Sequence, residues 1–231
     1  MILERGMQNY PSVVMDNFYN NADEIRQYAL SQKFFHAENS VHPGKRTKSL
    51  FDIDKEFNSF CIGKFLSLFY DLDHTEIKWN AETRFQLIEP YHNDPNHILN
   101  KSFIHTDGNC LIAGVVYLNP EPNCDSGTSF YTPNKSLGLI DTNNAIRKIY
   151  YNNRTQEEQY IKELEHNHKN FNETVIVKNV YNRIVAYDSN VFHTSTSVHA
   201  GNEPRLTQVF FIFDININLR SPLTRVKSYP N

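Results

Sequence analysis

A histidine and an aspartate stand two residues apart in the stretch SFIHTD, as His105 and Asp107. The stretch alternates like a β-strand, in which side chains i and i+2 point to the same face. Both side chains can therefore meet at one point and hold a divalent metal. A third ligand must come from a distant strand, and the candidate is His193 in SNVFHTSTSVHAG. Two histidines and one carboxylate leave three metal positions open, which suits non-haem Fe(II).

This pair is a weak signal when it is taken alone. The chain has 10 histidines, so chance pairs with acidic residues are common. A histidine in an aromatic-rich core is also more often hydrogen-bonded than bound to a metal. A structural role for His105 and Asp107 therefore stays open at this level.

A basic residue follows the distal histidine. Arg205 opens the apolar stretch RLTQVFFIF, and a buried guanidinium needs an anionic partner because an unpaired buried charge is destabilising. A guanidinium matches a carboxylate through two parallel hydrogen bonds. Thr207 lies on the same strand face and offers a hydroxyl donor. The partner of Arg205 is either a bound anion or a structural Asp or Glu.

The elements that must position these residues are mostly short strands. From residue 81 onward, short alternating or apolar runs are separated by turn signals, which predicts an all-β sandwich or barrel. The predicted strands are AETRFQLIE, SFIHTD, CLIAGVVYLN, SGTSFYTP, ETVIVKN, RIVAYDS and RLTQVFFIFDI.

Helices are predicted before and within this series. NNADEIRQYALSQKF has helical spacing with Asn21 as its N-cap, and DKEFNSFCIGKFLSLFYDL predicts an amphipathic helix. The apolar stripe of the latter comprises Phe57, Phe60, Cys61, Phe65, Leu68 and Phe69. NNRTQEEQYIKELEHNHKN predicts a third helix, with Thr155 and Glu158 as a capping box. Residues 133–172 are therefore interpreted as a helical insertion, which either covers a site or elaborates the surface.

The composition indicates a globular protein without a strong charge field. Of 231 residues, 39% are hydrophobic, and the formal net charge of −3 argues against a nucleic-acid partner. The basic run PGKRTK, residues 43–48, is typical of a solvated loop. Three cysteines without a C-x-x-C pair argue against a disulfide framework. Neither a signal peptide nor a membrane span is recognisable, so we expect a cytoplasmic protein without a membrane partner.

The order of these motifs resembles the Fe(II)- and 2-oxoglutarate-dependent dioxygenase superfamily, and its prolyl-hydroxylase-like branch in particular. The motifs are His105-x-Asp107, VVYLNP, SGTSFY, RIVAYDS, His193 and Arg205, in that order. The resemblance covers roughly residues 81–214. His193 follows YDSNVF at the family's position, which favours it over His199. This chain departs from the family pattern in having Ser126 where the first glycine is usual, and in a longer step from His193 to Arg205.

The resemblance implies a fold and an organisation of the chain. The expected fold is mainly β, a double-stranded β-helix or jelly roll of the cupin-like kind, with N-terminal helices that buttress one sheet. We expect a single domain over residues 1–231, with helical support in 1–80 and a catalytic core in 81–214. The core contains the helical insertion 133–172, and a C-terminal tail follows in 215–231.

The same resemblance implies a catalytic site for a hydroxylase. The metal ligands and catalytic residues would be His105, Asp107 and His193. Arg205 would bind the distal carboxylate of 2-oxoglutarate, Tyr117 stands where the family often has a phenol at this carboxylate, and Thr207 is a second donor. With Fe(II) and O2, such an enzyme couples oxidation of a substrate C–H bond to decarboxylation of 2-oxoglutarate.

The prime substrate is not identified by these motifs. Arg84 and Gln86 on the first core strand, and Tyr131 after SGTSF, are candidates for contacting it. A prolyl side chain of a protein is the first candidate from the branch; a free amino acid, another small metabolite and a modified nucleobase stay open. Two other classes also stay open: a cupin-like binding or structural jelly roll, and a metal-dependent enzyme that uses no oxo-acid. The oligomeric state is not indicated.

Overall fold

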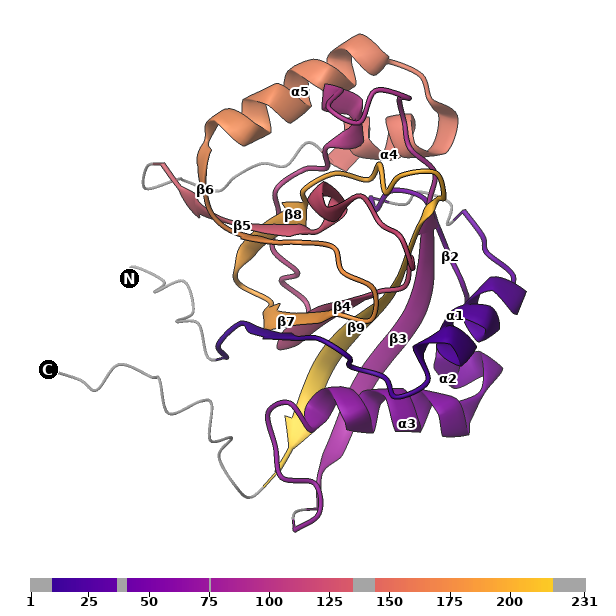
Figure 1. Ribbon diagram of the computed structural model, residues 1–231. Coiled ribbons are helices and arrows are strands. Elements are labelled where there is room, and N and C mark those ends of the chain that lie inside the picture. Colours follow the sequence, from indigo (N-terminus) through magenta and orange to yellow (C-terminus); the bar gives the residue numbers. More distant parts are fainter. Residues whose placement is uncertain (1–9, 37–40, 75, 135–143, 218–231) are drawn as a thin grey trace, which may run out of the picture.

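The fold is built from two antiparallel β-sheets (Figure 1). The computed structural model describes residues 10–36, 41–74, 76–134 and 144–217. The larger sheet has six strands in the order β1-β7-β4-β9-β3-β2. In this order the strands are Val13–Met15, Ile184–Asp188, Ile112–Tyr117, Arg205–Asn216, Lys78–Ile88 and Lys45–Arg46.

The smaller sheet has three strands in the order β6-β5-β8. They are Phe171–Val177, Thr128–Pro133 and Phe192–Ser195. One buried cluster contains residues of both sheets: Cys110, Ala113, Tyr117, Phe130, Val177, Val185 and Tyr187. Within it, the rings of Phe130 on β5 and Tyr187 on β7 meet edge to face with centroids 5.3 Å apart. The sheets therefore share a core, and the predicted mainly-β class is confirmed.

The strand predictions are confirmed for six of the seven stretches, which form β3, β4, β5, β6, β7 and β9. SFIHTD is the exception, because only His105 pairs there, in an isolated bridge to His193. Strands β1, β2 and β8 were not predicted. They contain 3, 2 and 4 residues, which is too short for a period-2 pattern to show. Strands β1 and β2 come from the region in which only helices were expected.

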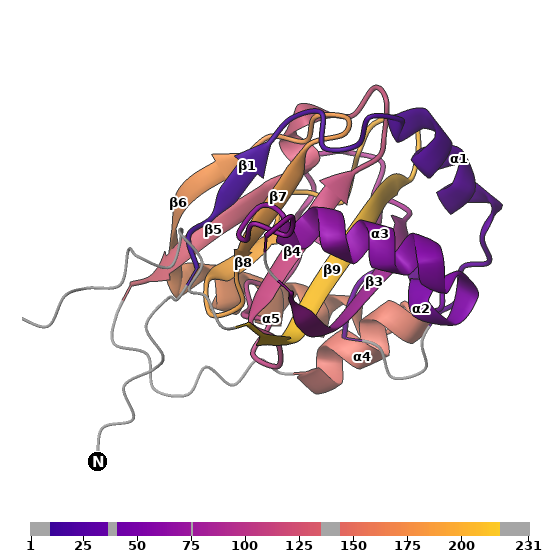
Figure 2. The same ribbon diagram turned by 90° about the horizontal axis from the view of Figure 1, so that it is seen from below.

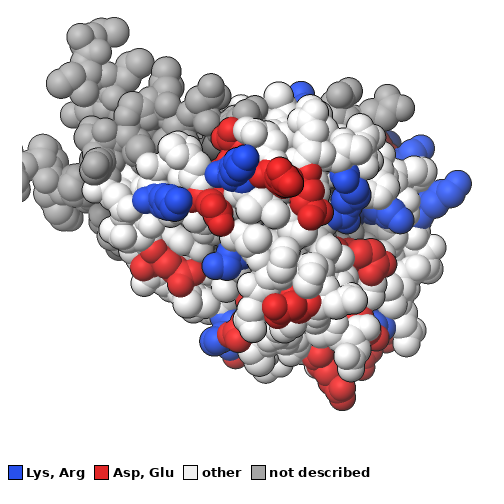
Figure 3. Space-filling view, turned by 90° about the horizontal axis from the view of Figure 1, so that it is seen from above, with Lys and Arg blue, Asp and Glu red and all other residues white. Residues whose placement is uncertain are grey.

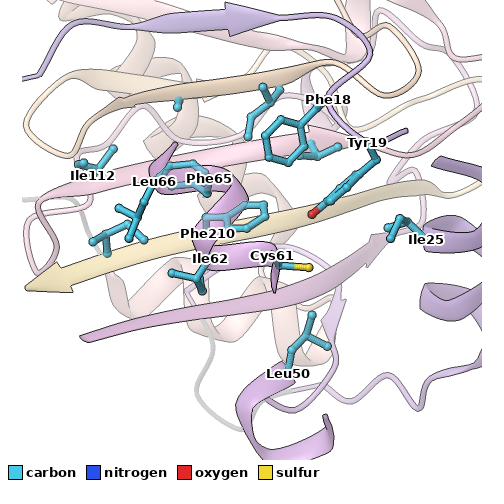
Figure 4. Close-up of a cluster of buried hydrophobic side chains, with 14 of the residues drawn as sticks. Phe18, Tyr19, Ile25, Leu50, Cys61, Ile62, Phe65, Leu66, Ile112 and Phe210 are labelled. Atoms are coloured by element: carbon cyan, nitrogen blue, oxygen red, sulfur yellow. The ribbon is translucent and has the colours of Figure 1, made fainter. Parts of the chain in front are cut away.

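Three helices cover one face of the larger sheet (Figure 2). They are α1 Ala22–Ser31, α2 Leu50–Ile53 and α3 Lys55–Leu66, and α3 lies across β4, β9 and β3. Phe65 of α3 stacks on Phe210 of β9, with ring centroids 4.8 Å apart (Figure 4). The apolar face of the helices and the outward face of the sheet thus form the main core.

The predicted helices end earlier than their patterns suggest. Asp54 caps α3 by accepting a hydrogen bond from the Phe57 amide, but the helix ends at Leu66 and Phe69 lies beyond it. Cys61, Phe65 and Phe69 are buried as predicted. Phe60 is 52% exposed, so its assignment to the buried stripe was wrong.

The insertion holds two helices, α4 Asn144–Asn153 and α5 Glu157–Lys169, between β5 and β6. They pack through a cluster of Tyr150, Tyr151, Tyr160 and neighbouring apolar residues. The capping box was wrong, because the N-cap of α5 is Gln156 in the left-handed region (φ 59°) and its side chain makes no capping bond. Figure 1 shows both helices at the end of the molecule opposite α3.

The described helices include none that is long and apolar enough to cross a lipid bilayer. The cysteines Cys61, Cys110 and Cys124 are free thiols. Burial raises the pKa of the Cys61 thiol to about 11, so this side chain acts as a small apolar group of the core.

Candidate metal centre

Backbone pairing brings the H-x-D segment next to the distal histidine. The His105 amide donates to the His193 carbonyl at 3.1 Å, and the His193 amide donates back to the His105 carbonyl at 2.9 Å. The Asp107 amide donates to the carbonyl of Ser189 at 2.9 Å. Main-chain hydrogen bonds therefore fix the separation of the three residues before any side-chain contact is made.

The three side chains point at one another, as expected from their types. Asp107 Oδ1 lies 3.6 Å from His105 Nε2, and Asp107 Oδ2 lies 3.3 Å from His193 Nε2. One ligand atom from each residue lies within 4.8 Å of the others. His199, the competing histidine, is not part of this cluster. Among the described residues this is the one group of three or more His, Cys, Asp or Glu side chains close enough to share an ion.

Hydrogen bonds set which nitrogen of each imidazole is free. His105 Nδ1 lies 2.8 Å from the Phe103 carbonyl oxygen, and His193 Nδ1 lies 2.9 Å from the Val191 carbonyl oxygen. A carbonyl can only accept, so both Nδ1 atoms carry the proton, and in the neutral rings both Nε2 atoms keep a lone pair. Metal-binding histidines are commonly held in this way. The donor set thus fits a divalent ion on chemical grounds.

The protonation states of His105 and Asp107 agree with this assignment. Burial, with the charge of His193, lowers the pKa of His105 to about 4. Burial by itself would raise the pKa of Asp107, but the interaction with His193 outweighs it and holds the pKa well below its ordinary value. At neutral pH, His105 is therefore neutral and Asp107 ionised, which is the form that metal ligation requires. Burial by itself would lower the pKa of His193, but the charge of Asp107 and its hydrogen bond outweigh burial and raise that pKa, so metal binding at His193 has to displace a proton.

Arg205 lies at the start of β9 in the same pocket and is 3% exposed. Its Nε donates to the Ser126 carbonyl at 2.9 Å, and its guanidinium lies 5.6 Å from the centre of the Tyr117 ring. No described carboxylate lies within ion-pair distance of it. The structural Asp or Glu that sequence reasoning left open is therefore not present among these residues.

The two further co-substrate candidates are buried beside Arg205. Tyr117 lies opposite Thr207 in the β4–β9 register, and its hydroxyl lies 2.7 Å from Thr128 Oγ1. Thr207 Oγ1 is buried and makes no hydrogen bond within the described part of the chain. Neither Tyr117 nor Thr207 is among the residues that line the pocket, so the structure places both behind its wall and not at its surface.

The pocket has a volume of about 620 Å³ and extends from the three ligands to β2 and α4. Of the three substrate candidates, Gln86 lines it. Arg84 does not, because its guanidinium is held by Glu82 at 2.5 and 2.8 Å. Tyr131 does not either, because its hydroxyl donates to Glu173 at 3.2 Å. The structure thus brings one of the three to the pocket.

Sequence reasoning missed several residues of the pocket wall. Arg46 of the basic run PGKRTK belongs to β2 and lines the pocket, so the run is not simply a solvated loop. Arg147 and Tyr151 line the pocket from α4. Their spacing of four residues places them on one helix face, which is a signal that the sequence contains.

The insertion also contacts the segment that carries the ligands. Asn167 of α5 is 5% exposed. Its Oδ1 accepts from the Ile104 amide at 2.8 Å, and its Nδ2 donates to the Ile104 carbonyl at 3.1 Å. A side-chain amide therefore takes the place of a neighbouring strand beside His105. His168 Nε2 lies 3.0 Å from the Ser102 carbonyl oxygen and adds a second contact.

The sequence matches one described family over most of its length. Residues 2–205 match DUF6445, a family of unknown function, and the chain belongs to this family. No curated protein matches the chain.

Solved structures add a fold comparison. HygX from Streptomyces hygroscopicus, solved with nickel and 2-oxoglutarate, is 10% identical with a TM-score of 0.52, over 89% of this chain and 83% of that chain. The epimerase SnoN, solved with Fe3+ and alpha ketoglutarate, is 10% identical with a TM-score of 0.52, over 96% of this chain and 86% of that chain. A prolyl-4-hydroxylase from Pseudomonas putida is 12% identical with a TM-score of 0.42, over 88% and 92%. At these identities the likeness to HygX and SnoN concerns the fold alone, and the predicted resemblance to 2-oxoglutarate oxygenases is confirmed as a resemblance of fold.

Proposed function

We propose that this protein is a non-haem Fe(II)- and 2-oxoglutarate-dependent oxygenase that hydroxylates a C–H bond of a small molecule or of a protein side chain. Its two sheets would then be the halves of a double-stranded β-helix. The observation that carries the proposal is the ligand geometry: two Nε2 atoms and one carboxylate converge, and both Nδ1 atoms are held by backbone carbonyls. HygX and SnoN, which share the fold, were solved with 2-oxoglutarate or alpha ketoglutarate and a metal ion.

In this proposal three side chains bind the metal, and the rest of the pocket binds the reactants. His105, Asp107 and His193 would hold the metal on one face and leave the opposite face open. When bound, Fe(II) supplies the oxygen chemistry: O2 and 2-oxoglutarate are converted to succinate and carbon dioxide, and one oxygen atom enters the substrate C–H bond. The chain itself binds and orients the reactants and shields them from water.

The co-substrate would lie between the metal and Arg205. The Nε of Arg205 is used by the Ser126 carbonyl, which leaves the two terminal nitrogens for a carboxylate. Thr207 lies on the same strand face but does not line the pocket, so no contact with this group is assigned to it. Tyr117 supports this end of the pocket through its ring contact with Arg205.

Anaerobic titration tests the proposal. Fe(II) and then 2-oxoglutarate are added to the purified metal-free protein, and the weak visible charge-transfer band of the iron chelate is recorded. We expect the band in the wild type and in His199→Ala, and its absence in His193→Ala. His199 is a matched control because it lies outside the ligand cluster. Iron binding without a band would refute the co-substrate, and absence of iron binding would leave a binding or structural protein.

A further inference from the structure

The candidate pocket carries an excess of positive charge that the metal ligands and the co-substrate do not balance. Three arginines line it, Arg46, Arg147 and Arg205, against the single acidic residue Asp107. The whole chain has a net charge of −3, and acidic and basic side chains are interspersed on the face in Figure 3. The positive excess is therefore local to the pocket.

Arg147 is a buried cation with no ionic partner among the residues that the structure describes. It is 6% exposed, and its terminal nitrogens donate to the Val41 carbonyl at 2.7 Å and to Asn144 Oδ1 at 3.3 Å. Its Nε is buried and makes no hydrogen bond to any described residue. Both of these acceptors are uncharged, so none of the described residues that it contacts neutralises the guanidinium charge.

Arg46, on the other wall of the pocket, likewise contacts a neutral group and no described carboxylate. One terminal nitrogen donates to Gln86 Oε1 at 3.3 Å, a long contact with a neutral group, and its buried Nε makes no hydrogen bond within the described part of the chain. Neither Arg46 nor Arg147 lies within ion-pair distance of a described carboxylate. Both arginines line one cavity, and neither guanidinium Nε has a hydrogen-bond partner among the described residues.

Aromatic rings hold both guanidinium groups in place. Arg46 lies 5.5 Å from the centre of the Phe211 ring, and Arg147 lies 5.2 Å from the centre of the Phe103 ring. A guanidinium fixed on a ring presents its N–H groups in a planar fork, which suits carboxylate or phosphate oxygens. The same rings provide apolar surface next to the charges.

The excess of positive charge remains when the proposed reactants are added. Fe(II) and the three arginines carry five positive charges, and Asp107 and the two carboxylates of 2-oxoglutarate carry three negative ones. Two positive charges remain, and they correspond to Arg46 and Arg147 once Arg205 is taken by the co-substrate. An anionic prime substrate would neutralise them.

We propose, building on the oxygenase function, that the prime substrate is a small molecule with a carboxylate or phosphate group, which Arg46 and Arg147 bind at the outer part of the pocket. Gln86, which already contacts Arg46, orients that guanidinium. The size of the cavity, about 620 Å³, fits a small metabolite. The ring surfaces of Phe103 and Phe211 would contact its apolar part.

Charge-matched probes test this inference by binding, without turnover. Binding of 4-fluorophenylacetate, 4-fluorophenyl phosphate and the neutral 4-fluorophenylacetamide is measured by ¹⁹F NMR on protein loaded anaerobically with Fe(II) and 2-oxoglutarate. We expect at least one anion to bind about tenfold or more tightly than the amide, and the tighter anion tells carboxylate from phosphate. Equal binding of amide and anions would overturn the inference.

Substitutions then locate the anion. Arg46→Met and Arg147→Met should each weaken anion binding about tenfold, whereas Arg46→Lys retains part of it. Arg26→Met is the matched control, because Arg26 is paired with Glu203 outside the pocket. If Arg147→Met does not fold, Arg46→Met decides, since the Arg46 side chain makes a single hydrogen bond to the described residues. Unchanged anion binding in Arg46→Met would refute the assignment.

Two further measurements separate this inference from the function on which it rests. Repeating the titration without metal and co-substrate asks whether the anion site exists by itself. Charge-selective binding that depends on Arg46, together with absence of the iron chelate band, would refute the oxygenase and retain the anion site. A normal band without charge-selective binding would refute the anion site and retain the oxygenase. If Arg46→Met instead raises only the 2-oxoglutarate concentration needed for the band, the arginine serves the co-substrate and the inference fails.

Discussion

At the scale of single residues, hydrogen bonds to the backbone decide what the side chains can do. The Phe103 and Val191 carbonyls fix the imidazole rings of His105 and His193, and the Ser126 carbonyl fixes Arg205. None of these carbonyls is visible in a motif, because every residue has one. A sequence therefore predicts which side chains meet, but not which of their atoms stay free.

Replacing Arg205 separates co-substrate binding from metal binding. In Arg205→Met, we expect the 2-oxoglutarate concentration for half-maximal band formation to rise by about tenfold or more, because a buried charge-assisted contact is lost. The affinity for Fe(II) alone should stay unchanged, since Arg205 is not a ligand. Anaerobic titrations of both components measure this, and a parallel loss of metal affinity would contradict the assigned role.

His42 makes folding stability sensitive to acid. Burial, and after it the charge of Arg46, lowers the pKa of His42 in the folded protein to about 3, from an ordinary value of 6.5. Below pH 6.5, His42 binds a proton in the unfolded chain but stays neutral in the folded chain. The free energy of unfolding therefore falls as the pH drops from 6.5 towards 3. Between pH 7 and 5, His42→Gln should lose less stability than the wild type, by on the order of 1 kcal/mol. Urea unfolding at both pH values measures this, and equal losses would refute it.

Some site residues could be predicted from the local sequence pattern, and others depend on tertiary contacts. The types and order of His105, Asp107 and His193 were sufficient to predict a cluster. Arg84 and Tyr131 were placed on strands correctly, but Glu82 and Glu173 hold them away from the pocket. Such partners depend on side-chain packing, which a strand pattern does not specify. Arg46 was missed for the converse reason, since two-residue strand β2 looks like a loop.

At the scale of elements, two glycines show how closely α3 approaches the sheet. A Cβ at Gly114 of β4 would lie 2.4 Å from Phe65 and 3.0 Å from the Val185 carbonyl oxygen. A Cβ at Gly63 of α3 would meet nothing within 4 Å. Gly114 therefore allows the helix to pack directly on the strand, whereas Gly63 has no such function.

The two alanine substitutions should have opposite effects. Gly114→Ala should lower the free energy of unfolding by roughly 1–3 kcal/mol, because Phe65 must move out of a packed core. Gly63→Ala should raise it by roughly 0.5–1 kcal/mol, because alanine restricts the unfolded chain and favours the helix. Chemical denaturation of both variants measures the difference, and equal stabilities would contradict the described packing.

The α5 helix positions a metal ligand through Asn167. In Asn167→Ala the Ile104 amide and carbonyl lose their partner next to His105, and we expect metal affinity to fall by about tenfold. Asn170→Ala is the control, because the Asn170 side chain bonds to the His166 carbonyl of its own helix. Calorimetric titration with Fe(II) or Ni(II) measures both. Equal affinities would show that the helix is not needed to place His105.

At the scale of the whole molecule, binding should stabilise the fold. A ligand that binds only the folded state at a hundred times its dissociation constant adds about 2.7 kcal/mol. For a protein of this size, that raises the melting temperature by roughly 5–10 °C. We expect this shift with Fe(II) or Ni(II) plus 2-oxoglutarate, its reversal by a chelator, and its absence in Asp107→Ala. Thermal scans under anaerobic conditions measure it, and an equal shift in Asp107→Ala would place the binding elsewhere.

The class of the fold was predictable because most of its strands are long enough to show their period. Strand β9 has 12 residues and β3 has 11, and they pair from end to end except at one bulge between Asn80 and Ala81, so their patterns predicted both. The strand order could not be predicted, because pairing across the sheet joins β1 and β2 from one end of the chain to strands far along it. Short edge strands depend on that tertiary context and not on local propensity.

The backbone bridge between His105 and His193 also bears on the thermodynamics of metal uptake. These two residues exchange both main-chain hydrogen bonds, so their conformational entropy is lost when the chain folds and not when the ion arrives. Metal-free and metal-bound forms should then share one backbone, unlike small domains that fold only around their ion. The ion would behave as an exchangeable ligand of a finished fold and not as the nucleus on which the chain assembles.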